Sequence, residues 1–536
     1  MKILMAEFEE SLRHDDIART LLGDRKQYID QTFSDQSDVN SRLEIIEFAL
    51  SRLGQGLYLD SCAEGVASIV KAGGKEKKRL LKLTEGFISG VLDAGYPAQT
   101  VYHLLNVAFL DNKRRKFSAA EMLDKFFSYF DLATHPYRVH FGVSDVNNTK
   151  EGMFGAIDAK YLSASSADVA DFMDSLPAST KRFFGGVPID GLLEIGHIDA
   201  LDPQSARQIA ERRVRLLDDL LRFSGHRTQF KLNNPALVSR IDKEVQYVHS
   251  NRPRPAVLRM PHESDDGTDD LSDIAGMFRK TKSSSMQRFL RAVELHGTAL
   301  STPEEESQLL NLWIAFETLF VTGSNGSKVK EVLDSVTSYV GSCWIGYELQ
   351  ELWAEVASNH DSQWQGAISE SDGIKRYPEN VGFFAAVALP KFEVEMTKFL
   401  GTLDENPLLR CKIVDCINWA QNPAKISNHL DEISARIAAD INRVYRYRNQ
   451  LVHIGHTMGD LGAVVQCAHH YLDVVLNLLT LILGKPGGPR TIEQANIEVR
   501  IKGASQRKLL AKGIADKKDC EDNSFLSFLM GRAPLA

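Results

Sequence analysis

The stretch from Leu430 to Gly484 constrains the fold more than any other part of the sequence. Its first half is charged, with apolar residues at helical spacing, and Gly455 and Gly459 then interrupt the pattern. Its second half is apolar, yet Asp473 and Asn477 interrupt an apolar run that is already shorter than the roughly 20 residues of a membrane span. We therefore predict two consecutive helices, the second of which lies inside a protein core.

The first half of the chain changes its apolar period once. Through the region 1–132, apolar residues recur at helical spacing, in the segments 43–53, 61–71, 77–94 and 119–132. Beyond residue 136 the spacing becomes the alternation typical of strands, in the segments 137–143, 192–200 and 226–232. Asp202-Pro203 is expected to start a long helix, because a proline in the first helical turn removes only an N–H that would lack a partner. We therefore expect a helical N-terminal region and then a small α+β domain over 133–250.

Prolines, glycines and acidic residues predict a linker over 251–285. The region 286–484 is expected to be a separate helical domain, since all five tryptophans lie there and the helical period returns. Its expected helices are 286–300, 303–321, 328–340, 347–356, 390–400, 426–452 and 461–484, with a loop-rich insert over 358–389. A basic tail is expected over 485–536, so the fold class as a whole is mainly α.

Composition narrows the class of protein. A chain of 536 residues with 43% apolar and 25% charged residues is typical of a soluble protein with two or three domains. A net charge of -8 argues against a general nucleic-acid coat, so any RNA contact must use local patches. The cysteines are scattered, and the N-terminus turns acidic before a signal peptide could form. We therefore expect reduced thiols and a cytoplasmic location without a membrane anchor.

Several enzyme classes lack support in the sequence. The residues 323–328 resemble a phosphate-binding loop in composition, but the spacing is wrong and no strand precedes them. The sequence contains no zinc-protease helix motif, no Gly-x-Ser-x-Gly turn and no dinucleotide-binding glycine cluster. Cys467, His469 and His470 lie close together, yet a histidine pair without a carboxylate partner is more typical of packing than of a metal site. We expect no metal and no cofactor.

Arg448, Asn449 and His453 are the candidate catalytic residues, with Arg446 as a supporting candidate, at the expected end of the helix before Gly455. Histidine can take or give a proton near neutral pH, and arginine offers forked donors to phosphate oxygens. Asn449 stands four residues before His453, so the amide and the imidazole share a helix face. Arg448 points about 140° away from His453 and must reach back toward it.

The spacing of Arg448 and His453 is weak evidence by itself. With 33 arginines and 15 histidines in the chain, about one such pair is expected by chance, and Arg291 and His296 form another. Asn449, the helix break and the apolar helix that follows favour the later pair. The alternative is that the basic residues only complement the negative end of the helix dipole.

Glu317 has two interpretations, because it stands alone among apolar neighbours. It is either a buried carboxylate that holds Arg448 or an exposed residue on a narrow polar stripe with Asn311 and Thr318.

An all-helical domain with Arg-polar-x3-His at the end of its penultimate helix, followed by an apolar helix, resembles the HEPN superfamily. The segment Leu309–Phe320 also resembles the first-half helix of the subgroup found in anti-phage and abortive-infection proteins. The resemblance covers about residues 286–484. It implies a helical bundle, a homodimer in which two motifs form one cleft, and metal-independent cleavage of RNA by Arg448, Asn449 and His453.

These observations predict a cytoplasmic, dimeric, metal-independent endoribonuclease, an effector of anti-phage defence or of a related toxin system. Its expected partners are an RNA substrate, with tRNA as one candidate, a second copy of the chain, and a regulatory protein or phage-derived trigger. The first 285 residues are expected to sense, inhibit or bind substrate, since a nuclease toxic to its own cell needs control. Two alternatives stay open: a non-catalytic HEPN-like scaffold that binds RNA, nucleotide or a protein, and a chain that is only the target of a nucleotidyl-transfer system.

Overall fold

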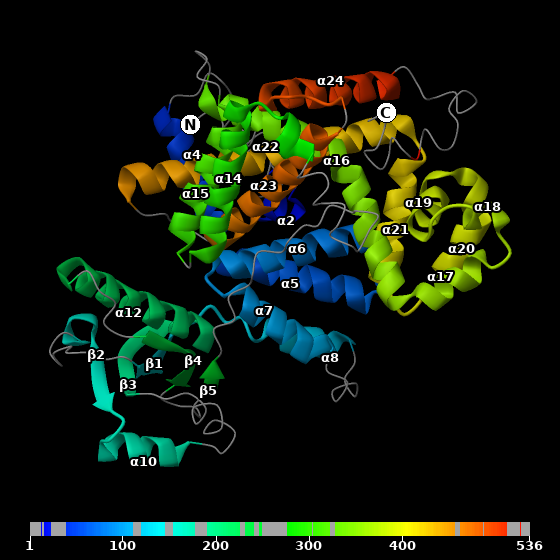
Figure 1. Ribbon diagram of the computed structural model, residues 1–536. Helices are drawn as coiled ribbons and strands as arrows, with labels where there is room; N and C mark the ends of the chain where they lie inside the picture. Colours follow the sequence, from blue (N-terminus) through cyan, green and yellow to red (C-terminus); the bar gives the residue numbers. More distant parts are fainter. Residues whose placement is uncertain are drawn as a thin grey trace. The chain divides into compact units, whose positions relative to one another are not determined.

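The computed structural model describes residues 12, 15–22, 39–110, 119–144, 154–176, 190–225, 231–240, 246–248, 276–302, 304–321, 327–455, 461–485, 487–511 and 526. Its contacts divide the chain into two units, Met1–Pro253 and Arg254–Ala536, each of which is described by itself (Figure 1). The boundary falls inside the expected linker, of which residues 251–275 lie outside the described residues.

Unit 1 begins with helices, as the periodicity of 1–132 predicts. They are α2 (Asp16–Leu21), α4 (Val39–Arg52), α5 (Gln55–Lys71), α6 (Lys77–Asp93), α7 (Ala98–Leu105), the π-helical stretch η1 (Asn106–Leu110) and α8 (Ala119–Phe127). Their core is aromatic: the ring of Phe130 lies 5.7 Å from that of Phe87 and 5.2 Å from that of Phe126, both edge-on. Edge-on contacts of this kind are favoured between aromatic rings, so these residues hold α6 and α8 together.

The rest of unit 1 is an antiparallel sheet with a helix on each face, which confirms the expected α+β character. The strands are β1 (His135–Ser144), β2 (Ala159–Ser163), β3 (Gly191–Ala200), β4 (Lys231–Arg240) and β5 (Gln246–Val248), in the order β2-β3-β1-β4-β5. A short 3-10 helix, η3 (Gly155–Ile157), precedes β2.

Helix α12 (Pro203–Gly225) covers one face of this sheet, and α10 (Ala167–Ser175) contacts the other. Leu192 and Leu193 are neighbours in β3 and are both fully buried, because side chains alternate between faces and each face is covered. The strands predicted at 137–143 and 192–200 and the helix predicted after Asp202 are confirmed. For the strand predicted over 226–232, residues 226–230 lie outside the described residues, and β4 extends eight residues further than predicted, to Arg240.

Unit 2 is helical throughout its described residues, which confirms a mainly α fold class. Its longer helices are α14 (Ser283–Ser301), α15 (Glu305–Phe320), α16 (Lys328–Asn359), α21 (Pro407–Ala420), α22 (Pro423–Ile454), α23 (Leu461–Gly484) and α24 (Ile492–Ala511). Shorter helices lie between α16 and α21: α17 (Asp361–Ile368), α18 (Asp372–Lys375), α19 (Glu379–Ala388), the 3-10 helix η4 (Pro390–Phe392) and α20 (Glu393–Gly401).

Two hydrophobic cores share the long helices α16 and α22. The first core contains buried residues of α14, α15, the first half of α16, the second half of α22, α23 and α24. The second core contains the second half of α16, the helices from α17 to α21 and the first residues of α22. The candidate catalytic residues therefore lie on the part of α22 that packs in the first core.

Two predicted features of unit 2 were wrong. The helices predicted at 328–340 and 347–356 are one helix, α16, which continues through Gly341 and Gly346. Its burial in both cores outweighs the roughly 1 kcal/mol that each glycine costs in a helix. The insert predicted as loop-rich over 358–389 is largely helical, because Trp364 and Phe383 anchor it in the second core.

The stretch expected as a basic tail from residue 485 contains α24, whose Ile492, Ala495 and Val499 are buried in the first core. Among the described residues, α23 is long and apolar enough to cross a membrane, but Leu472, Val475 and other side chains of α23 pack into the first core. As predicted, α23 is a core helix, and it supports the helix that precedes it.

Candidate active site

Helix α22 is regular through the whole candidate motif and ends directly after it. The Asn422 side chain caps its first turn by accepting hydrogen bonds from the N–H groups of Ala424 at 3.0 Å and Lys425 at 3.4 Å. Gly455 ends it with a φ of 82°, and its N–H donates to the carbonyls of Gln450 and Leu451. A left-handed residue strongly favours glycine, so the break predicted after His453 is placed by Gly455 itself.

The helical period determines which side chains share a face at this end. Asn449 and Arg446 stand four and seven residues before His453, so all three lie on one side of α22. Arg448 projects about 140° away, but its Nη1 donates a hydrogen bond to Asn449 Oδ1 at 3.0 Å. The amide therefore turns the guanidinium toward the shared face. His453 is exposed, whereas Arg446, Arg448 and Asn449 are half-buried.

Glu317 does not hold Arg448: no ion pair joins them among the described residues. Its carboxylate instead accepts a hydrogen bond from Trp313 Nε1 at 2.8 Å. The Trp313 ring in turn lies 5.2 Å from the ring of Tyr445 on α22. Glu317 thus orients an indole that supports the end of α22, a positioning role that sequence reasoning did not find because its partners lie on different helices.

Arg291 and His296, the competing pair, lie in a different environment. Arg291 forms an exposed ion pair with Glu294 at 2.8 Å within α14. His296 faces α23, where its Nε2 lies 2.8 Å from Asp473 Oδ1, close enough for an ion pair although without hydrogen-bond alignment. The imidazole of His296 is therefore engaged inside unit 2, whereas that of His453 is open to a substrate.

His469 and His470 belong to the packing of α23. Burial is the main cause that lowers the pKa of each imidazole to about 4, and for His469 the neighbouring His296 lowers it further. The ring of His469 lies 5.3 Å from that of His296, and neither of its nitrogens has a hydrogen-bond partner among the described residues. Within the same part of the chain, no group of three or more histidine, cysteine, aspartate or glutamate residues could hold a metal ion.

We expect His469→Leu to reduce the acid sensitivity of unit 2. The ordinary pKa of 6.5 applies in the unfolded chain and about 4 in the folded one, so the unfolded chain binds more protons between these values. Stability is therefore lost as pH falls from about 6.5 toward 4. Urea midpoints at pH 7.5 and pH 5 should differ less in His469→Leu than in the wild type. An equal difference in both would contradict the buried, neutral His469.

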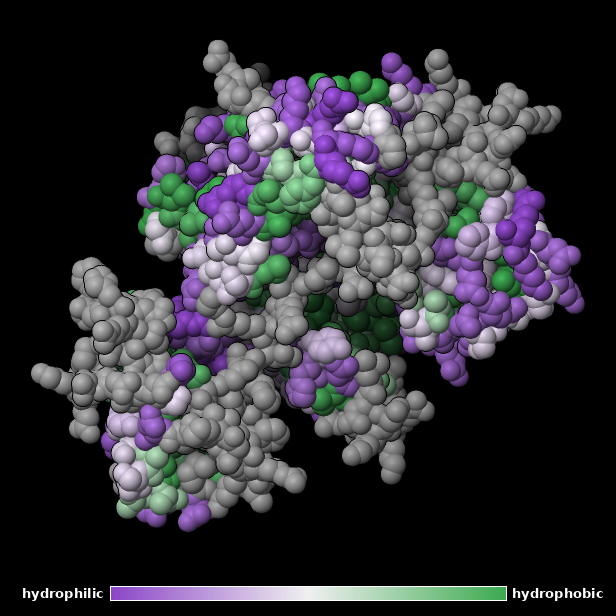
Figure 2. All heavy atoms as spheres, in the orientation of Figure 1, coloured by the Kyte–Doolittle hydropathy of each residue, from purple (hydrophilic) through white to green (hydrophobic). Residues whose placement is uncertain are grey.

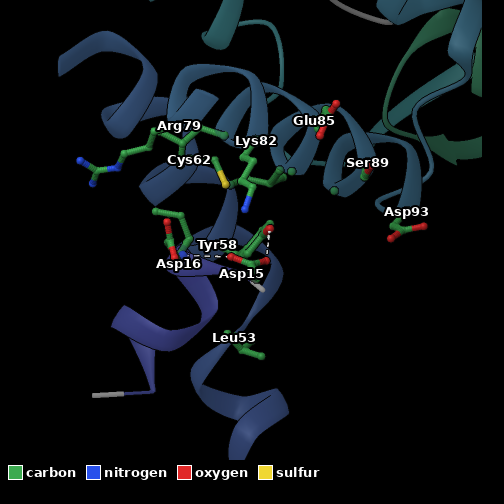
Figure 3. A pocket seen from close by; sticks show the side chains of 15 residues that line it. Asp15, Asp16, Leu53, Tyr58, Cys62, Arg79, Lys82, Glu85, Ser89 and Asp93 are labelled. Atoms are coloured by element: carbon green, nitrogen blue, oxygen red, sulfur yellow. Dashed lines mark hydrogen bonds between the residues drawn. The ribbon is translucent and has the colours of Figure 1, made fainter. Parts of the chain in front are cut away.

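Unit 1 contains a cavity of about 590 Å³ between α2, α5 and α6 (Figure 3). The Tyr58 hydroxyl donates to Asp15 Oδ2 at 2.6 Å, and the other carboxylate oxygen caps α2. Gly86 lets α5 approach α6, since a Cβ there would lie 2.7 Å from the Tyr58 oxygen. The polar groups best placed to bind a ligand, Asp15 and Tyr58, thus already hold α2 on α5, so we assign the cavity no function.

Comparison with known proteins does not identify the chain. No protein-family model, no curated protein and no solved structure matches it.

Proposed function

We propose that this protein is an endoribonuclease that cleaves RNA through the 2′-hydroxyl, with its active site at the C-terminal end of α22. The observation that carries the proposal is the pairing of Arg448 with Asn449 beside the exposed imidazole of His453. Arginine, amide and histidine are the groups that this reaction requires. The resemblance of the surrounding helices to the HEPN superfamily points to the same chemistry.

The reaction needs a base, an acid and a cation. A base removes the proton of the 2′-hydroxyl, the 2′-oxygen attacks the adjacent phosphorus, and the 5′-oxygen leaves with a proton from an acid. His453 is the residue for one of these proton transfers, because histidine exchanges protons near neutral pH. Arg448 stabilises the charge that accumulates on the phosphate oxygens, and Asn449 orients Arg448 and the ribose or phosphate.

We propose that the active unit is a homodimer, in which His453 of a second copy supplies the complementary proton transfer. Val452 and Ile454 flank His453 and are 50% and 62% exposed. Apolar side chains on both sides of an exposed imidazole suit a surface that a second protein chain covers in part. Two-fold symmetry would then place both imidazoles at one cleft.

We further propose that the protein is a cytoplasmic effector of anti-phage defence or of a toxin system and that unit 1 regulates it. The HEPN-like end of α22 and the separate folding of Met1–Pro253 support this arrangement. A regulatory protein or a phage-derived molecule is the expected trigger, and tRNA is one candidate substrate.

The proposal is tested with purified full-length protein, bulk tRNA or total RNA, and EDTA. We expect cleavage that survives chelation and leaves 2′,3′-cyclic phosphate ends, because the 2′-oxygen itself is the nucleophile. Substrates with 2′-deoxyribose should remain intact. RNA that is bound but never cut would favour the non-catalytic scaffold, and cleavage that requires a divalent cation would contradict the proposed chemistry.

A further inference from the structure

Helix α14 exposes a stripe of apolar residues that nothing in unit 2 covers. Leu290, Val293 and Leu300 are 43%, 40% and 48% exposed, although the opposite side of α14 is buried in the first core. Together with Gly297 they follow a 3-4-3 spacing, which places them along one edge of the helix. Figure 2 shows apolar side chains gathered over α14 and α15. This spacing is the one by which two helices pack side by side.

Gly297 has no structural reason within its own chain. It lies inside α14 with a surface open to solvent, and no heavy atom lies within 4 Å of a Cβ built there. By contrast, Gly86 and Gly90 each accommodate a side chain of α5. A glycine inside a helix is unfavourable compared with alanine, so this one is best explained by the close approach of another chain.

The charges beside the stripe match a second copy of α14 that runs antiparallel. Arg291 and Glu294 are exposed, opposite in charge and three residues apart. An antiparallel two-fold pairing centred between Val293 and Glu294 sets Leu290 of one copy opposite Gly297 of the other. It brings Arg291 within about half a turn of Glu294 of the second copy. A parallel pairing in register would instead set each charge against its like.

We propose that the Leu290–Val293–Gly297–Leu300 face of α14 is the surface through which two copies of this chain associate, antiparallel, with Leu290 against Gly297 of the other copy. The inference rests on the dimer of the proposed function, for which it names the surface. Helix α14 packs on α15, and Trp313 of α15 contacts Tyr445 of α22. A dimer formed through α14 therefore holds the two candidate sites at a constant separation.

The test measures mass and does not depend on RNA cleavage. We expect the full-length protein to be a dimer by light scattering, and Leu290→Lys with Val293→Lys to weaken association on the order of 100-fold or more, because each lysine would be buried without a partner. Val394→Lys is the matched control, since Val394 is 64% exposed on α20. Circular dichroism of each variant checks the fold.

Cross-linking tests the geometry independently of variant stability. Val293→Cys lies at the two-fold axis and should form a cross-linked dimer, whereas Val394→Cys should not. A monomeric wild-type protein, or a dimer unaffected by the α14 lysines, would overturn the inference. A dimer that depends on α14 but cuts no RNA would leave the inference standing and would reject the proposed function.

Discussion

His453→Ala is expected to reduce the rate of RNA cleavage by about 10²–10⁴-fold, the usual contribution of one general acid or base. The imidazole is exposed on the last turn of α22, so its removal leaves no cavity in the core. RNA binding should change little, because Arg446 and Arg448 still offer their charge to phosphates. The measurement is the initial cleavage rate of a defined RNA at saturating substrate, with binding measured separately.

His296→Ala is the matched control for this experiment. It removes a histidine at the same Arg-x4-His spacing, but one that is engaged with Asp473 inside unit 2. We expect cleavage to persist in His296→Ala, although its stability will fall. If His296→Ala abolished cleavage and His453→Ala did not, the active site would have been assigned to the wrong helix. Arg448→Lys should also be impaired, since lysine keeps the charge but loses the forked donors.

Local signals in the sequence were sufficient wherever one residue decides an element. Gly455 adopts a left-handed conformation and ends α22 where the sequence predicts, and α23 begins at the first residue of the apolar pattern. By contrast, the glycines of α16 do not end that helix, because its side chains are buried on both sides of them. The same residue type thus gave opposite outcomes, and tertiary burial decided between them.

The candidate site shows the same limit. Sequence spacing correctly places Asn449 on the face of His453, and it leaves Arg448 pointing away. The hydrogen bond from Arg448 to Asn449 joins adjacent residues, so a local argument could have found it. The contact of His296 with Asp473 and the link from Glu317 through Trp313 to Tyr445 join different helices. Such contacts depend on how helices pack, which no local pattern encodes.

Trp313→Ala is expected to destabilise unit 2 by about 3–5 kcal/mol, the usual loss for a large aromatic residue removed from a core. Trp313 is fully buried, contacts Tyr445 and donates to Glu317. Its loss therefore creates a cavity and leaves the Glu317 carboxylate without its donor, which adds a penalty for an unpaired half-buried group. All five tryptophans lie in unit 2, so fluorescence during urea unfolding follows this unit without interference from unit 1.

Trp313→Phe separates the two contributions of this residue. Phenylalanine retains most of the ring that packs on Tyr445 but has no N–H for Glu317, so its loss of stability should be clearly smaller than that of alanine. Trp364→Ala provides the comparison from the second core, where Trp364 is also fully buried. It should be comparably destabilising in urea. Under native conditions, however, only Trp313→Ala should slow RNA cleavage, because only Trp313 supports the end of α22 that carries Arg448 and His453. Equal cleavage rates in the two folded alanine variants would show that the Trp313–Tyr445 contact does not position the active site.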